Sequence, residues 1–173
     1  MCFTFSKQML DHTETLVVGA RAPEFSLEAA NRDGILTLSG FLKRGSLILE
    51  FLRGTWCPNC VQRMARVELI KKEIEQSRAE LAYVAAEKRD GVFKPAKFLE
   101  KNPVSFPFML DEDRSVTKSY GLYHRFGMDA LNIAHPATLV IDSERNVRFI
   151  YRGDNQSDRA PLEQVMSTVK KLS

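Results

Sequence analysis

Apolar residues recur along the chain in two patterns, one typical of buried strands and the other typical of amphipathic helices. The segment 46–52 (Ser-Leu-Ile-Leu-Glu-Phe-Leu) is almost continuously apolar and is flanked by Gly45 and Gly54. A run of this length between glycines favours a buried central strand. The segment 81–86 (Leu-Ala-Tyr-Val-Ala-Ala) has the same character and predicts a second buried strand.

A helical period follows the first of these strands. Apolar residues three or four positions apart fall on one helical face: Met64, Val67, Ile70 and Ile74. Pro58 suits the first turn of this helix, because a backbone N–H is not needed there. The segment between 52 and 58 is therefore predicted to be a turn that joins a strand to a helix.

The rest of the chain continues the alternation of strands and helices. The further segments with such patterns are helices at 92–101, 113–120 and 162–169, and strands at 108–110, 137–141 and 147–151. Alternating strands and helices indicate a parallel sheet, and the last two strands form a hairpin that adds antiparallel pairing. The pattern predicts an α/β fold, with a central mixed β-sheet flanked by helices on both faces.

The composition fits one soluble domain. The chain has 173 residues, of which 44% are hydrophobic and 27% charged. We predict a single domain over residues 17–173, preceded by a lead-in at 1–16. The net charge of +3 is small and the basic residues are dispersed, which disfavours nucleic acid as a partner. No apolar run approaches the roughly 20 residues that span a bilayer, and the start lacks a secretory pattern, so we expect no membrane partner and a cytoplasmic location.

Two of the three cysteines carry the strongest chemical signal. Cys57 and Cys60 form a Cys-x-x-Cys pair at the predicted strand-to-helix turn, where the two sulfurs can meet across one helical turn. At a helix N-terminus, the unpaired backbone N–H groups stabilise a thiolate. We therefore expect an exposed Cys57 with a lowered pKa to be the attacking thiol and Cys60 to be the resolving thiol.

The alternatives to a redox pair are half of a zinc site or two inert core cysteines. Structural zinc usually has four ligands, and the spare candidates lie at unsuitable spacings: Cys2, His12, His124 and His135. We predict no metal and no cofactor.

Four segments, in order along the chain, resemble the alkyl hydroperoxide reductase/thiol-specific antioxidant family, the peroxiredoxin-like branch of the thioredoxin superfamily. They are 19–27 (Gly-Ala-Arg-Ala-Pro-Glu-Phe-Ser-Leu), 36–39 (Leu-Thr-Leu-Ser), 51–60 (Phe-Leu-Arg-Gly-Thr-Trp-Cys-Pro-Asn-Cys) and 135–142 (His-Pro-Ala-Thr-Leu-Val-Ile-Asp). The resemblance implies a thioredoxin-like fold and an enzyme that reduces disulfides or hydroperoxides. It also implies electrons from a thiol reductant such as a thioredoxin or glutathione system. Family members are often dimers, but no residue pattern in this sequence decides the oligomeric state. A monomer and a homodimer therefore both stay open.

The chain departs from the peroxiredoxin pattern Pro-x-x-x-Thr-x-x-Cys. An ungapped match puts Cys60 on the peroxide-reacting position, Cys57 in place of the threonine and Arg53 in place of the proline. The arginine that the family brings near this cysteine would lie near His135 and Pro136, where none is present. In thioredoxin, which the Trp-Cys-x-x-Cys motif resembles, a cis proline faces the disulfide, and Pro136 matches that position.

A charged residue interrupts the first apolar strand. Glu50 matches a buried acid of thioredoxin, and a buried carboxyl with a raised pKa would be able to accept the proton of Cys60. The alternatives are that Glu50 faces solvent or pairs with Arg53. Arg53 itself either stabilises a thiolate by its charge or lies on the surface.

The candidate residues for binding substrate or partner surround the cysteine pair: Thr55, Trp56, Pro58 and His135. Trp56 is expected to pack beside the disulfide and the partner surface. His135 either faces Cys57 and titrates near neutral pH or occupies a loop without a role.

These residues give three hypotheses for function. The first is a thiol-disulfide oxidoreductase that cycles Cys57 and Cys60 to reduce substrate disulfides. The second is a thiol peroxidase with peroxiredoxin activity, in which one cysteine becomes a sulfenic acid and the other condenses with it. The third is a non-catalytic redox sensor or binding module.

Overall fold

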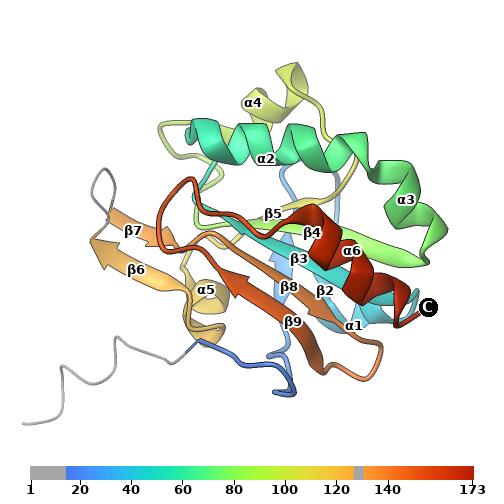
Figure 1. Cartoon of the computed structure of the whole chain (residues 1–173). Helices are drawn as coiled ribbons and strands as arrows, with labels where there is room; N and C mark the ends of the chain where they lie inside the picture. Colours follow the sequence, from blue (N-terminus) through green and yellow to red (C-terminus); the bar gives the residue numbers. More distant parts are fainter. Residues whose placement is uncertain (1–14, 127–130) are drawn as a thin grey trace, which may run out of the picture.

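A five-stranded sheet forms the centre of the protein, which is described by a computed structural model over residues 15–126 and 131–173 (Figure 1). The strand order is β5-β4-β3-β8-β9. The five strands are β3 (Ser46–Leu52), β4 (Ala79–Ala85), β5 (Phe108–Leu110), β8 (Ala137–Ile141) and β9 (Val147–Arg152). Strands β3, β4 and β5 are parallel, whereas β8 and β9 run antiparallel to their neighbours. The predicted mixed sheet is confirmed.

Helices cover both faces of this sheet, as predicted. Side chains of β3 alternate between two cores: Ile48 and Leu52 belong to one, and Leu47 and Phe51 to the other. The first core is covered by α2 (Pro58–Leu69), α3 (Lys71–Gln76), α4 (Pro95–Lys101) and α6 (Leu162–Lys170), and the second by α1 (Leu38–Leu42) and α5 (Ser115–Ser119). Figure 1 shows α2 and α5 on opposite sides of the sheet. Both cysteines of the pair belong to the first core.

Two small hairpins lie outside the central sheet, and the sequence patterns did not predict them. They are formed by β1 (Ser26–Glu28) with β2 (Ile35–Thr37) and by β6 (Tyr123–Phe126) with β7 (Leu131–Ala134). Each strand has only three or four residues, and apolar residues such as Ile35 and Phe126 are exposed. Runs this short contain too few positions for an alternation of apolar and polar residues to identify them as strands.

The helix predicted from residue 92 begins three residues later. Lys94 has a left-handed backbone, with φ of 44°, and Pro95 occupies the first helical turn. Because a proline disfavours helical geometry in the residue before it, the helix starts at the proline. Val92 and Phe93 consequently remain in an exposed loop.

Some sequence-based predictions fall outside the described residues. Residues 1–14, with Cys2 and His12, belong to the predicted lead-in, and the division at residue 17 stays a prediction. Within the residues that the structure describes, no helix combines the length and the apolar character needed to cross a bilayer.

Candidate active site around Cys57 and Cys60

The turn between β3 and α2 positions the cysteine pair. Cys57 is the residue that precedes α2, and Pro58 occupies the first helical turn. The Cys57 backbone N–H donates to the Gly54 carbonyl over 3.3 Å, which closes the turn. Gly54 has φ of 153°, and a Cβ there would lie 2.3 Å from Nε1 of Trp56. Only glycine therefore allows the chain to turn this closely against the tryptophan.

Both thiols are free and buried, and the exposed fraction of Cys57 is 0%. The expectation of an exposed Cys57 is therefore wrong. The reason is that the whole turn folds into the molecule, because Arg53 and Thr55 are also buried although both are polar. The Arg53 guanidinium stacks over the ring of Trp56, 4.9 Å from its centroid. The reactive sulfur thus lies in a region that excludes water.

The two sulfurs differ strongly in acidity. A hydrogen bond from the Cys60 side chain lowers the pKa of Cys57 from 9.0 to about 6, although burial opposes this shift. The Cys60 backbone N–H and the charges of Arg53 and Arg159 lower the pKa further. The same hydrogen bond, together with burial, raises the pKa of Cys60. At neutral pH, Cys57 is therefore the thiolate and Cys60 the protonated thiol that donates to it.

Arg159, which the sequence analysis did not identify, lies beside the pair. It comes from the segment between β9 and α6, and its Nη2 donates to Cys60 Sγ over 3.3 Å. Its Nε and Nη1 are buried and have no hydrogen-bond partner among the described residues. Arg53 Nη1 donates to Oε1 of Gln156 over 2.6 Å, which ties the same segment to the turn. Guanidinium groups from two distant segments thus flank the pair.

Glu50 is buried, but it is not the free carboxyl that was expected. Its Oε1 forms an ion pair with Nη2 of Arg63 over 2.6 Å, and Nε of Arg63 contacts both carboxylate oxygens. Arg63 is itself buried and also donates to the Ala160 carbonyl and to Oγ1 of Thr138. The alternatives of a solvent-facing Glu50 and of pairing with Arg53 are both wrong. Because Arg63 occupies both oxygens, Glu50 holds α2 against the sheet.

Pro136 does not have the expected cis bond. No peptide bond within residues 15–126 or 131–173 is cis, and the bond between His135 and Pro136 is therefore trans. The chain passes directly from β7 into β8 here, with the His135 N–H donating to the Leu122 carbonyl and the Pro136 carbonyl accepting from Gly153. These two bonds hold the segment in place on both sides of the proline.

His135 and Thr55 have partners that the sequence did not reveal. The imidazole of His135 stacks on that of His124, with ring centroids 4.5 Å apart and planes 8° apart. Thr55 donates its backbone N–H and its hydroxyl to the carboxylate of Glu87 over 2.9 and 2.8 Å. Burial raises the pKa of this carboxyl, and Glu87 lies two residues after the end of β4. Glu87 therefore fixes the turn that carries Cys57.

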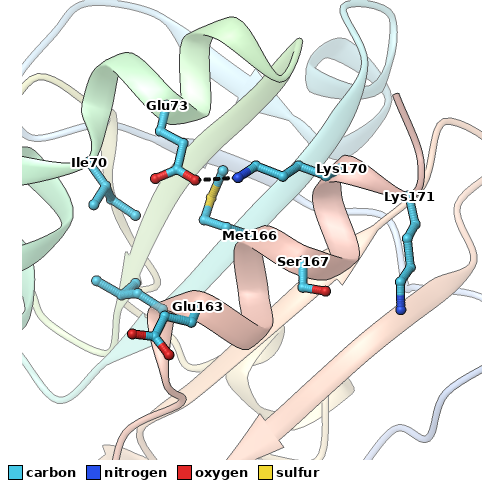
Figure 2. Close-up of a pocket in the computed structure, with 8 residues that line it drawn as sticks. Ile70, Glu73, Glu163, Met166, Ser167, Lys170 and Lys171 are labelled. Carbon is cyan, nitrogen blue, oxygen red and sulfur yellow. Dashed lines mark hydrogen bonds and ion pairs between the residues drawn. The ribbon is translucent and has the colours of Figure 1, made fainter.

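Two cavities differ in their relation to the cysteines. The larger, of about 560 Å³, lies between Ile70, near the end of α2, and α6, and the ion pair of Lys170 with Glu73 crosses it (Figure 2). The 12 residues of α2 span about 18 Å, so this cavity lies at the helix end opposite the cysteines. The second, of about 400 Å³, is lined by Trp56 and is therefore the one beside the reactive turn.

Alkylation of Cys57 will report its lowered pKa. Because the thiolate is the reactive form, the rate of modification by iodoacetamide is expected to rise with a midpoint near pH 6. Mass spectrometry of the Cys57 adduct over a pH series measures this midpoint. The Cys60→Ser variant replaces the thiol that donates a hydrogen bond to Cys57. The midpoint of Cys57 alkylation is therefore expected to move in this variant. A wild-type midpoint near the ordinary thiol value of 9.0 would contradict the assignment.

Replacing Arg159 by glutamine will reduce the reactivity of Cys57 at neutral pH. Removal of this positive charge raises the pKa of Cys57, and each unit of increase lowers the thiolate fraction by about tenfold well below the new midpoint. The alkylation midpoint is the measurement. Arg148→Gln is the matched control, because Arg148 lies on β9 and pairs with Asp142 instead. Equal midpoints in both variants would exclude the role of Arg159.

Replacing Glu50 by glutamine will destabilise the fold. The substitution leaves the Arg63 guanidinium buried without its counter-charge, which typically costs about 3–5 kcal/mol. Urea unfolding measures the loss. The double variant Glu50→Gln with Arg63→Met removes the unpaired charge, so it is expected to recover part of the stability. A loss of less than about 1 kcal/mol in the single variant would show that the pair is not a structural clamp.

Comparisons with known proteins agree with this fold. The family model described as Redoxin matches residues 17–166. A thiol:disulfide interchange protein, DsbE of Yersinia pestis, is 27% identical over 161 residues, which cover 91% of this chain and 76% of that protein. The chain is therefore similar to proteins whose chemistry is thiol redox exchange.

Solved structures show the same fold. The peroxidoxin BcpB from Mycobacterium tuberculosis matches with a TM-score of 0.77 and 22% identity, over 90% of this chain and 97% of that one. A peroxiredoxin-like protein from Aquifex aeolicus matches with a TM-score of 0.79 and 19% identity, over 93% and 90% of the two chains. The fold is thioredoxin-like. With the family match over most of its length, the chain belongs to the Redoxin family of thiol oxidoreductases and peroxidases.

Proposed function

We propose that the protein is a thiol-disulfide oxidoreductase that uses Cys57 as its nucleophile and Cys60 as its resolving thiol. The observation that carries the proposal is the opposite shift in the pKa values of two hydrogen-bonded thiols. A lowered pKa makes Cys57 the better nucleophile at neutral pH, whereas a raised pKa keeps Cys60 protonated until it is needed. Two inert core cysteines would have no reason to differ in this way.

The reaction proceeds in two exchange steps. The Cys57 thiolate attacks one sulfur of the substrate disulfide, the S–S bond breaks, and the first substrate thiolate leaves and takes a proton from solvent. Cys60 then gives its proton to solvent, and the resulting thiolate attacks the Cys57 sulfur. This step forms the Cys57–Cys60 disulfide and releases the second substrate thiolate. The substrate gains two electrons, which a thiol reductant later returns to the protein.

Arg159 supports the second step. As Cys60 loses its proton, negative charge develops on a sulfur that lies 3.3 Å from Nη2 of this arginine. A guanidinium at hydrogen-bond distance stabilises this charge in a buried site, where water cannot. The arginine therefore offsets the burial that otherwise raises the pKa of Cys60.

A thiol peroxidase is the second candidate, and the free donors of Arg159 favour it. The buried Nε and Nη1 groups, which lack partners among the described residues, suit a peroxide oxygen beside the sulfurs. In this reaction the Cys57 thiolate attacks one peroxide oxygen, the O–O bond breaks, and water or an alcohol leaves after gaining a proton. Cys57 becomes a sulfenic acid, and Cys60 then displaces water from it to form the disulfide.

The reductant and compartment follow from the chemistry. A Cys57–Cys60 disulfide has to be reduced after each turnover, so we propose a thioredoxin or glutathione system as the electron source. Such systems keep thiols reduced in the cytoplasm, which is the proposed location.

One set of rates separates the candidates. In a Cys2→Ser background, which removes the third thiol, the reduced protein is mixed with hydrogen peroxide and separately with insulin, and Trp56 fluorescence is followed by stopped flow. We expect insulin to be reduced and peroxide to react no faster than with free cysteine. Fast reaction with peroxide and none with insulin would support the peroxidase.

Two variants assign the roles of the cysteines in the same assay. Cys57→Ser is expected to abolish reaction, whereas Cys60→Ser is expected to stop at a mixed disulfide between Cys57 and substrate, visible by mass spectrometry. A trapped adduct on Cys60 in the Cys57→Ser variant would reverse the roles. Reaction no faster than free cysteine with either substrate would instead support a non-catalytic sensor.

A further inference from the structure

An apolar groove lies beside the residue that precedes the nucleophile. Val92, Phe93 and Leu131 line it together with Trp56, and their exposed fractions are 89%, 56% and 64%. The Phe93 ring packs 5.8 Å from that of Trp56. We call this cavity of about 400 Å³ the Trp56 groove. Large apolar side chains gathered at one cavity indicate a binding surface.

The accessible charge of the Trp56 groove is positive. Lys88 and Arg114 contribute cationic side chains to its lining, and Lys88 is exposed and has no ion pair within residues 15–126 and 131–173. Among the described residues of the lining, the one carboxylate is that of Glu87, which is buried and already accepts two hydrogen bonds from Thr55. An occupant with an acidic group therefore complements the rim better than a basic one.

The position of the groove connects it to the reactive sulfur. Trp56 and Cys57 are consecutive, so their Cα atoms lie only about 3.8 Å apart. Cys57 has no exposed surface, and Trp56 is the half-buried residue of its turn. A side chain that enters the groove contacts Trp56 and Phe93, the rings next to the nucleophile. It would thus hold a neighbouring disulfide within reach of Cys57.

We infer that the Trp56 groove binds the polypeptide substrate: an extended segment in which a large apolar residue and an acidic residue lie beside the disulfide cysteine. The apolar side chain fills the space between Trp56, Phe93 and Val92, and the carboxylate lies against Lys88. The inference rests on the proposed disulfide reductase activity and specifies its substrate class. Thiol-disulfide exchange itself does not distinguish one disulfide from another. In this proposal the Trp56 groove supplies the selectivity, because it binds the residues beside the disulfide cysteine.

Four disulfide peptides test this selection. Each carries its cysteine as a mixed disulfide with thionitrobenzoate, whose release is coloured, and the neighbouring pair is Leu-Asp, Leu-Lys, Ser-Asp or Ser-Lys. Hydroxyethyl disulfide serves as a small substrate without groove contacts. We expect kcat/KM for the Leu-Asp peptide to exceed that for Ser-Lys at least tenfold, mainly through KM. Equal values for all four peptides would overturn the inference and leave the reductase activity intact.

Variants of groove residues test whether the Trp56 groove is the source of the peptide preference. Val92→Asp is expected to remove the preference for leucine, and Lys88→Glu to make Leu-Lys better than Leu-Asp. Leu69→Asp is the matched control, because Leu69 is exposed on α2 and does not line the groove. Leu69→Asp is expected to keep the wild-type preferences and to reduce hydroxyethyl disulfide as the wild type does. Unchanged preferences in Val92→Asp and Lys88→Glu would overturn the inference.

A binding measurement keeps the inference separate from the chemistry. The Leu-Asp peptide with serine in place of cysteine cannot react, so its effect on the fluorescence of Trp56, the only tryptophan of the chain, reports docking alone. Saturable binding that is weakened in Val92→Asp supports the groove even if no disulfide is reduced. Absence of reduction of every disulfide together with such binding would refute the proposed reductase and not the docking surface. Absence of binding would refute the docking surface.

Discussion

The buried ion pair between Glu50 and Arg63 joins the parts of the molecule on which the site depends. Glu50 belongs to β3, and Arg63 belongs to α2, the helix that begins beside the nucleophile. Arg63 also donates to Thr138 of β8 and to the carbonyl of Ala160, the residue after Arg159. One guanidinium therefore fixes the start of α2, two strands and the segment that carries Arg159. A buried charge pair often stabilises a core less than well-packed apolar side chains would, but it specifies one arrangement of its neighbours.

The difference between the two thiols follows from that arrangement. The sulfurs of Cys57 and Cys60 share a hydrogen bond in a region without water, where the direction of the bond decides which sulfur is charged. Burial disfavours the thiolate of either residue. Arg53 and Arg159 oppose this for Cys57, and Arg159 also does so for Cys60. Arg53 is held by Gln156, and the segment of Arg159 is held by the contact of the Ala160 carbonyl with Arg63 of α2. The helix N-terminus contributes as well, because the backbone N–H of Cys60, in the first turn of α2, also lowers the pKa of Cys57.

Sequence patterns predicted what depends on neighbours in the chain. The apolar run at 46–52 matches β3 residue for residue, and the turn into α2 falls at Pro58. Arg159 lies 99 residues from Cys60, and no local pattern marks an arginine in a loop as a partner of a sulfur. Glu87 meets Thr55 only because β4 pairs with β3 and ends at the same edge of the sheet. The burial of Cys57 likewise depends on tertiary packing, whereas the trans bond at Pro136 is the ordinary state of an X–Pro bond, for which the resemblance to thioredoxin led us to expect cis.

The complete burial of Cys57 means that a bound substrate does not yet contact the reactive sulfur. A folded disulfide protein is too large to reach a sulfur without exposed surface, so the turn has to move before exchange begins. The side chains that cover this turn are Arg53, stacked on Trp56, and Phe93, packed beside it. An apolar residue that competes for Trp56 and Phe93 would therefore loosen the cover at the point where its own disulfide arrives. Such coupling protects the thiolate from chance oxidants, since a sulfur without exposed surface is closed to a small peroxide as well until the turn moves. Burial of Cys57, which opposes its acidity, thus makes its reactions depend on what contacts the Trp56 groove.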